Sequence, residues 1–153
     1  MHYRIDEPDY WQLPDKLKSM AVNAAKVNVK IAIRALGDPD APGTPAVMTL
    51  AFPPGFEIER HAHRGARFEV IVKGSMLVGD GKVLRAGDVM VAGDEEQYGP
   101  HVAGPDGCTT VEVFTSLAAT HQILLDRVGG WTLVDHLEGR RYDVERKQAA
   151  AAE

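Results

Sequence analysis

Two histidines, His61 and His63, stand one residue apart in the segment PPGFEIERHAH, which covers residues 53–63. FEIERHAH, residues 56–63, is predicted to be a β-strand, and side chains two positions apart on a strand point to the same face. Two imidazoles arranged in this way can bind one metal ion at ligand distances of about 2 Å. Glu57 and Glu59 share the predicted face, and a row of polar residues is also typical of a strand face in water. The pair alone therefore leaves both interpretations open.

The spacing of glycines and histidines around this pair resembles the first signature of the cupin superfamily, G-x5-H-x-H-x3-E-x6-G. Gly55, His61, His63 and Gly74 stand at the positions that the signature requires. Arg67 occupies the position of the glutamate, and a guanidinium cannot be a metal ligand because it has no acceptor atom. The first signature is therefore matched at every position except one.

A later segment resembles the second cupin signature. LRAGDVMVAG, residues 84–93, is similar to the Gly-Asp hairpin that opens this signature. His101 precedes a predicted turn and the last barrel strand, as the histidine of the second signature does. The Pro-x-Gly of the family is missing before His101, and Tyr98 stands where simple spacing would place the ligand. The resemblance covers roughly residues 46 to 116, about half of the chain.

The resemblance implies a metal site with His61, His63 and His101 as ligands. In the family, three histidines and one glutamate surround a divalent metal ion. Glu69, two residues beyond Arg67 on the same strand face, could supply the missing carboxylate or could form an ion pair with Arg67. We favour the ion pair. Three neutral imidazoles then remain to hold Fe(II), which we favour, or alternatively Zn, Ni, Cu or Mn.

Such a site predicts an enzyme that acts on a small anionic molecule. Three neutral ligands leave the charge of a divalent ion in place, which favours chelating anions such as a β-diketonate or a carboxylate. By the resemblance to cupin dioxygenases, we expect an oxidation or a C–C bond cleavage that uses oxygen. Arg67 could hold the charge of the substrate, and Glu69 and Tyr98 are further candidate catalytic residues. Tyr98 could instead pack with its hydroxyl in water.

Two other classes of function remain open. A Zn(II) or Ni(II) ion could act as a Lewis acid in an isomerase, cyclase or lyase, with Tyr98 or Glu69 as the acid or base. Alternatively, Arg67 could mark a lost metal site, and the barrel would be a metal-free ligand-binding or regulatory protein without catalysis. His2, His121 and His136 lie outside both signatures, and we interpret them as surface or packing residues.

The strand pattern predicts the architecture independently of the histidines. Apolar and polar residues alternate in VNVKIAIRAL, residues 27–36, and further short segments follow between clusters of Gly, Pro and Asp. This spacing predicts an all-β fold, a cupin-type antiparallel β-barrel or double-stranded jelly roll, with short terminal helices. GPDG, residues 104–107, is predicted to be a turn. Residues 118–128 could form a helix or a strand, and residues 140–153 a solvated helix or a frayed tail.

The composition limits the domain organisation and the partners. A length of 153 residues, 44% of them apolar, fits one domain over residues 1–153 with a barrel core at about 27–116. The net charge of -5 argues against nucleic acid and anionic membranes as partners. The charged beginning of the chain is unlike a signal peptide, so we expect a cytoplasmic protein. By resemblance to small cupins, and from the apolar edge segment at residues 27–33, we expect a homodimer.

Overall fold

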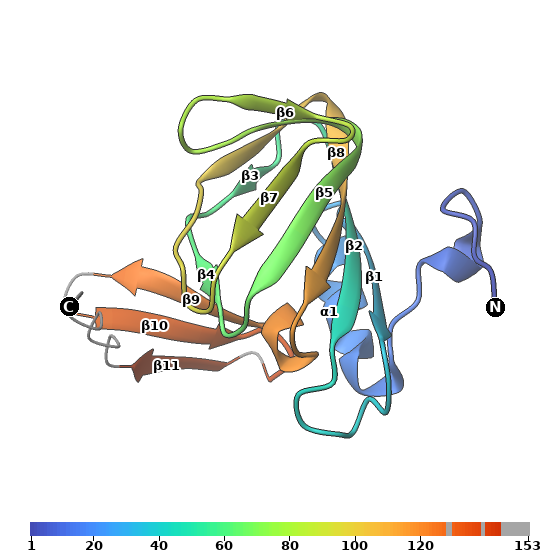
Figure 1. Cartoon of the computed structure of the whole chain (residues 1–153), viewed down its shortest axis with the longest axis vertical. Coiled ribbons are helices and arrows are strands. Elements are labelled where there is room, and N and C mark those ends of the chain that lie inside the picture. The colour runs from blue at the N-terminus through green and yellow to red at the C-terminus, as the bar shows by residue number, and fades with distance from the viewer. Residues whose placement is uncertain (128–129, 139, 145–153) are drawn as a thin grey trace.

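The computed structural model of the chain describes residues 1–127, 130–138 and 140–144, which form two antiparallel β-sheets (Figure 1). The larger sheet has the strand order β1-β2-β8-β5-β6, with β3 paired to β8 and β7 paired to β5, and the smaller sheet has the order β11-β10-β9-β4. The predicted all-β antiparallel fold class is thereby confirmed. The strands of the larger sheet are β1 (Lys30–Ala35), β2 (Ala46–Phe52), β3 (Glu57–Ile58), β5 (Arg67–Leu77), β6 (Val83–Arg85), β7 (Val89–Ala92) and β8 (His101–Phe114). Those of the smaller sheet are β4 (Ala62–His63), β9 (Gln122–Arg127), β10 (Gly130–Asp135) and β11 (Arg140–Val144).

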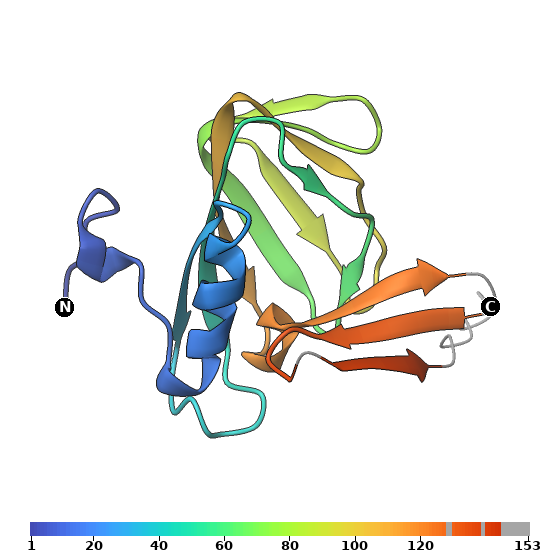
Figure 2. The same ribbon diagram turned by 180° about the vertical axis from the view of Figure 1, so that it is seen from behind.

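The N-terminal part of the chain covers one side of the larger sheet. The alternation predicted for residues 27–36 is observed only in part, because Ile31 and Ile33 are buried and Lys30 is exposed, but Ala32 is buried as well and Val27 is exposed. The short helix α1 (Lys18–Ala25) lies across β1 and β2 (Figure 2), and its buried Met20 packs in the same core cluster as Phe114 of β8. Two 3-10 turns, Pro8–Tyr10 and Asp15–Leu17, precede this helix. The helix and the two strands therefore form one apolar wall of the barrel.

The chain passes from one sheet to the other at the two histidines. The continuous strand predicted for residues 56–63 is wrong, because β3 pairs with β8 in the larger sheet whereas β4 pairs with β9 in the smaller one. His61 lies between these strands and forms an isolated bridge with Tyr98. The break turns the histidine side chains inwards, while Glu57 and Glu59 remain exposed, although both also line the cavity that the histidines face.

The predicted turn at residues 104–107 is also wrong, because this segment continues within β8. The chain there is irregular, with register shifts between β5 and β8, and both Gly74 and Gly107 have positive φ angles, +73° and +77°. A Cβ on Gly74 would overlap the carbonyl oxygen of Gly107, so only glycine allows the two strands to approach this closely. The glycines therefore mark a place of irregular strand pairing and not a turn.

The C-terminal part of the chain is a β-sheet and not a helix. After the 3-10 turn Ala118–Thr120, residues 122–144 form β9, β10 and β11, apart from those at 128–129 and 139, which lie outside the described residues. The strand alternative for residues 118–128 is thus the one observed, and the helix predicted for residues 140–153 is wrong at β11. The rest of that segment, residues 145–153, lies outside the described residues. Among the helices that are described, none has the length and apolar character needed to cross a membrane.

Candidate functional site

The two sheets and α1 enclose a cavity of about 430 Å³. All six residues that the sequence predicts to be functional line it, together with one carboxylate that was not predicted: His61, His63, Arg67, Glu69, Tyr98, His101 and Glu112. The opposite wall is apolar and includes Met20, Val29, Ile31, Met48, Leu50 and Phe52, which come from α1, β1, β2 and the residue before β1. The cavity therefore has a polar side, contributed by β4, β5, β8 and the loop before β8, and a side made of hydrocarbon.

All three histidines use the same ring nitrogen, Nδ1, to bond to a backbone carbonyl oxygen. The Nδ1–H of His61 donates to the Glu59 carbonyl oxygen at 2.6 Å, and that of His63 donates to the Ala119 carbonyl oxygen at 2.5 Å. His101 donates in the same way to the Pro100 carbonyl oxygen at 3.1 Å. A carbonyl oxygen can only accept, so each Nδ1 carries the proton and each Nε2 keeps its lone pair. Metal-binding histidines are held in this way in proteins.

Burial keeps these imidazoles neutral. The side chains of His61, His63 and His101 are all buried, and loss of hydration lowers the pKa of His61 to about 4 and that of His63 well below its usual value. Burial also lowers the pKa of His101. The nearby guanidinium of Arg67 acts in the same direction on all three. At neutral pH the three rings are therefore uncharged, which is the state that can bind a metal ion.

The ring of Tyr98 contacts all three histidines. Its centroid lies 4.6 Å from that of His61, 6.2 Å from that of His63 and 5.6 Å from that of His101. The Tyr98 hydroxyl donates a hydrogen bond to Nε2 of His61 at 2.9 Å, and two backbone hydrogen bonds join the same two residues. Burial raises the pKa of the Tyr98 hydroxyl well above its usual value, so the phenol carries its proton. The alternative in which this hydroxyl points into water is therefore wrong.

Arg67 is held by two buried carboxylates. Its Nη1 forms an ion pair with Oε2 of Glu69 and donates a hydrogen bond, at 2.8 Å, to Oε2 of Glu112. Glu69 and Glu112 are register partners on β5 and β8, so their side chains emerge opposite each other and Arg67 joins them. The guanidinium also lies against the face of Tyr98, with Cζ 3.8 Å from the ring centroid. Of the two alternatives for Glu69, the structure has the ion pair with Arg67.

Glu112 is the functional residue that the motifs miss. It is buried, and the loss of hydration, with the negative charge of Glu69 beside it, raises the pKa of Glu112 to about 8. At neutral pH Glu112 is therefore protonated, and the carboxylate of Glu69 alone balances Arg67. Parity along TTVEVF, residues 109–114, could have found it, because Glu112 alternates with Thr110 and Phe114, and all three are buried.

His136 also lines the cavity, although its position in the sequence suggests packing. It follows the end of β10, and its backbone N–H donates to the carbonyl oxygen of His121. The ring of His121 bonds through Nδ1 to Asp135 at 3.0 Å, and the same carboxylate accepts from the backbone N–H of Leu137 and Glu138. No sequence motif predicts that His136 lines the cavity, since the C-terminal sheet lies beyond the cupin-like segment.

The chemistry of these donors fits a metal ion. His61 and His63 have ring centroids 5.0 Å apart, and Nε2 of His101 is a buried atom without a hydrogen-bond partner within the described part of the chain. In that part of the chain, however, no group of three or more His, Cys, Asp or Glu side chains is gathered closely enough to hold a metal ion. The assignment of His61, His63 and His101 as ligands thus stays a prediction. The ring of Tyr98 contacts all three histidines, and its hydroxyl oxygen lies beside Nε2 of His61.

Comparisons with known proteins agree with the architecture. No protein-family model matches this sequence, and no curated protein matches it. Among solved structures, an RmlC-like cupin from Shewanella frigidimarina superposes with a TM-score of 0.48 and 24% identity, over 57% of this chain and 76% of that one. For KdgF from Halomonas sp. the values are 0.46 and 24%, over 57% and 78% of the two chains.

An RmlC-like cupin from Ralstonia eutropha has a TM-score of 0.47 and 22% identity, over 66% of this chain and 62% of that one. Several other similar structures are also described as cupins. These structures are what the chain is similar to, and the cupin superfamily stays the resemblance that the sequence motifs predict. The likeness is one of fold, and the chemistry must be derived from the residues in the cavity.

The protonation of Glu112 predicts a pH-dependent stability that Glu112→Gln should remove. Because the pKa of Glu112 is raised on folding, its proton stabilises the folded state fully in acid, and this contribution is lost as the pH rises through about 8. Between the usual glutamate pKa of 4.5 and the folded value of about 8, the free energy of unfolding should then fall by up to about 1.4 kcal/mol per pH unit. Urea unfolding at a series of pH values measures this slope.

Glu7→Gln, at an exposed residue near the N-terminus, is the control and should keep the wild-type slope. The histidines contribute equally to the pH dependence of wild type, Glu112→Gln and Glu7→Gln. The readout is therefore the difference between the slope of Glu112→Gln and that of the other two proteins. Equal slopes for wild type and Glu112→Gln would mean that Glu112 is ionised in the folded protein.

Proposed function

We propose that this chain, which resembles cupins in its motifs and strand pattern, is a metal-dependent enzyme whose cavity binds a small organic substrate. His61, His63 and His101 would hold the divalent ion, with Fe(II) favoured. The reaction that fits best is an oxygen-using oxidation or C–C cleavage of a chelating anion, such as a β-dicarbonyl compound. One observation supports this above the others, namely that all three Nδ1–H groups donate to backbone carbonyl oxygens, so that each Nε2 keeps the lone pair with which it could bind a metal, that of His61 once it no longer accepts from Tyr98.

When bound, an ion such as Fe(II) supplies Lewis acidity and one-electron chemistry towards oxygen. The chain itself supplies the environment. The apolar wall from α1, β1 and β2 excludes water and would hold the hydrocarbon part of the substrate. On the polar side, the Tyr98 hydroxyl is a hydrogen-bond donor that could turn from His61 to a substrate oxygen.

The ion pairs change the role expected for Arg67. Its Nη1 is already bonded to Glu69 and Glu112, and one negative carboxylate balances its charge, so the guanidinium adds little attraction for an anion. The preference for an anionic substrate then depends on the ion and its three neutral ligands. Arg67 instead holds Glu69 away from the ion and supports the ring of Tyr98.

A second function is favoured by the hydrogen bond between Tyr98 and His61. A phenol that donates to a neutral imidazole is an acid beside a base, and the pair could move a proton between the carbon and oxygen atoms of an enolisable substrate. This chemistry belongs to an isomerase, cyclase or lyase, in which oxygen takes no part. Glu69 is less suited to be the base, because Arg67 holds its carboxylate.

Metal binding by the histidines is tested with a His61→Ala, His63→Ala double variant. After anaerobic incubation with Fe(II) and desalting, we expect about one equivalent of iron in the wild type and at least a tenfold loss of affinity in the variant, because two of three ligands are gone. Elemental analysis and titration calorimetry measure both. His2→Ala, at an exposed histidine outside the cavity, is the control and should bind iron as the wild type does.

The wild type could instead take up no iron, zinc, nickel, copper or manganese under any loading condition. That result would contradict a metal enzyme and support the metal-free binding protein.

The reaction class is tested by oxygen consumption of the iron-loaded protein with a panel of β-dicarbonyl and phenolic compounds. A dioxygenase should consume oxygen in proportion to substrate. The acid–base alternative predicts no oxygen consumption and incorporation of deuterium from heavy water into the carbon positions of a substrate, measured by NMR. In that case Tyr98→Phe should reduce the exchange rate by about 10²-fold or more, since it removes the acid.

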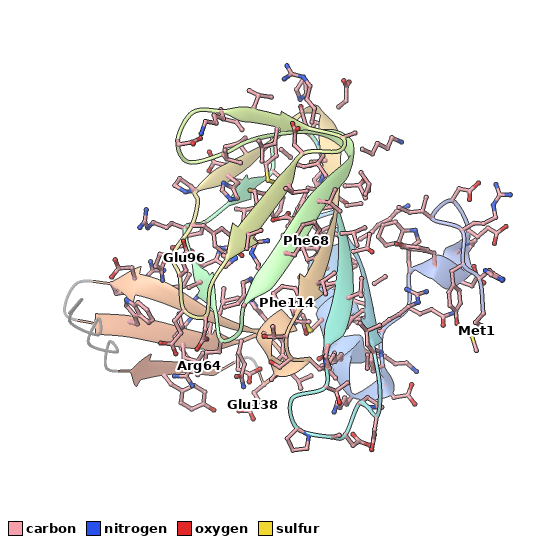
Figure 3. The ribbon with its side chains drawn as sticks, viewed as in Figure 1. Met1, Arg64, Phe68, Glu96, Phe114 and Glu138 are labelled. Atoms are coloured by element: carbon pink, nitrogen blue, oxygen red, sulfur yellow. The ribbon has the colours of Figure 1, made fainter. Side chains whose placement is uncertain are left out.

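We also infer that the predicted homodimer forms through the outer face of β5, β7 and β8. Phe68 (labelled in Figure 3), Val91 and Val113 are register partners on these strands, and their exposed fractions are 41%, 72% and 39%. Val72 and Val89 extend the same exposed apolar face. A contiguous apolar patch of this kind is typical of a protein–protein interface. β1 is an edge strand of the larger sheet, so pairing of β1 between two subunits is the alternative dimer interface.

Val91→Lys should convert the dimer into a monomer, because it places a charge in the apolar patch. Light scattering after size exclusion should give twice the chain mass of 16.6 kDa for the wild type and the single mass for this variant. Val22→Lys, at a similarly exposed valine on α1 (62%), is the matched control and should remain dimeric. A monomeric wild type would contradict the dimer, and a dimeric Val91→Lys would favour pairing through β1.

A further inference from the structure

Two buried polar atoms of residues that line the cavity have no hydrogen-bond partner within the described part of the chain. One is Nε of Arg67, which carries a hydrogen. The other is Nε2 of His101, which keeps a lone pair because the Nδ1–H of the same ring donates to the Pro100 carbonyl oxygen. An unpaired polar group in a protein interior costs folding free energy, so a donor and an acceptor left unpaired together point to a ligand that pairs both.

The two unpaired atoms belong to the same end of the cavity. Arg67 and His101 both lie against the ring of Tyr98, with the Arg67 Cζ 3.8 Å and the His101 ring centroid 5.6 Å from the Tyr98 ring centroid. Both residues are deeply buried, with exposed fractions of 4% and 5%. The polar end of a single ligand, inserted at the Tyr98 ring, can therefore serve both residues.

The groups around Arg67 disfavour an anion at this end of the cavity. Nη1 of Arg67 is bonded to Glu69 and Glu112, which are buried, so the guanidinium has no unbalanced positive charge to offer. A carboxylate would meet these oxygens and the lone pair of His101, and it has no hydrogen to donate. A neutral primary amide or hydroxyl group both accepts and donates, and so can pair with both atoms.

The rest of the cavity favours hydrocarbon. Met20 of α1 and Met48 of β2 belong to its apolar wall, together with Leu50 and Phe52. The volume of about 430 Å³ lies in the range of small-molecule sites. A ligand with an alkyl or similar apolar body would bury that body against this wall while its polar end lies at Arg67 and His101.

We propose that the cavity, without a metal ion, binds a neutral molecule that has an apolar body and a polar end of the primary-amide or hydroxyl type. The polar end accepts a hydrogen bond from Nε–H of Arg67 and donates one to Nε2 of His101. This inference goes beyond the proposed function, because it requires no ion and names a ligand of different charge.

Three compounds with the same hexyl chain separate the contributions of the polar end. Heptanamide accepts and donates, octan-2-one only accepts because a methyl group replaces the NH2, and heptanoate is an anion at pH 7. Titration calorimetry on the full chain after removal of metals with a chelator measures the affinities. We expect heptanamide to bind about tenfold more tightly than octan-2-one, because the ketone leaves Nε2 of His101 unpaired. Heptanoate should bind at least about tenfold more weakly than heptanamide.

His101→Phe tests the acceptor directly. It removes the lone pair and keeps an aromatic ring, so heptanamide and octan-2-one should bind this variant with affinities equal to within about threefold. His2→Phe, at an exposed histidine outside the cavity, is the control and should keep the tenfold difference. If His101→Phe does not fold, the comparison of the three compounds on the wild type still decides, since it needs no substitution.

Methionine methyl groups report where the ligand lies. In wild-type protein labelled with ¹³C at the methionine methyl groups, heptanamide should give nuclear Overhauser effects to Met20 and Met48, which line the cavity. Met90 lines a second cavity of about 470 Å³, which Arg67, Tyr98 and His101 also line, and Met1 is fully exposed. Neither of these methionines should show the effect, and Met→Leu variants assign the signals.

Several outcomes would overturn the inference. They are no binding of heptanamide, equal affinities for heptanamide and octan-2-one in the wild type, tighter binding of heptanoate, and Overhauser effects to Met90 or Met1 in place of Met20 and Met48. None of them bears on the metal enzyme, which the iron-binding test decides separately. Binding of heptanamide to a protein that takes up no metal would support this inference and contradict the metal enzyme.

Discussion

The buried guanidinium of Arg67 is the constraint on which the rest of the site depends. A charge that is removed from water must be paired, and here the cation takes two carboxylates and the face of an aromatic ring. The cost of leaving any of these partners alone is high, because Glu69 and Glu112 are themselves buried. The single replacement in the first cupin signature therefore decides where Glu69 points, while burial and the neighbouring Glu69 are the reasons that Glu112 keeps its proton.

The histidines are positioned in part by elements that lie outside the cupin-like segment. His63 is on β4, which pairs with β9, and its Nδ1–H is held by the carbonyl oxygen of Ala119. Arg127 at the end of β9 forms an ion pair with Glu59 at 2.8 Å, beside His61. The orientation of the His63 ring thus depends on the 3-10 turn and on β9, whereas His61 and His101 are oriented by Glu59 and Pro100 within the cupin-like segment. The apolar wall opposite them likewise requires α1, so the terminal extensions are part of the site.

Alternation and turn residues in the sequence predict the fold class, and the spacing of His61, His63 and His101 predicts which residues meet in the cavity. What the sequence does not predict depends on register. The pairing of Glu69 with Glu112 follows from the alignment of β5 with β8, which is shifted at the irregular pairing around Gly74. The C-terminal segments contain no motif, and their pattern of apolar and polar residues is compatible with a helix as well as with a strand. Only the pairing of β9 with β4 in the structure identifies the strand. Local propensity could not decide between helix and strand for this segment, because the strand that pairs with β9 is far away in the sequence. Ala62 of β4 is the register partner of Leu124 of β9.

The bond between Tyr98 and His61 links the two proposed kinds of chemistry and makes them exclusive. Nε2 of His61 has one lone pair, which either accepts the proton of the phenol or binds an ion. Without an ion, Tyr98 and His61 form an acid–base pair in a cavity where the charges of Arg67 and Glu69 cancel, so there is little electrostatic preference for an anion. With an ion, the same lone pair is used for coordination, proton transfer by this pair stops, and the positive charge of the ion dominates. In the proposed enzyme, occupancy of one nitrogen by a metal would therefore determine both the class of reaction and the charge of the preferred substrate.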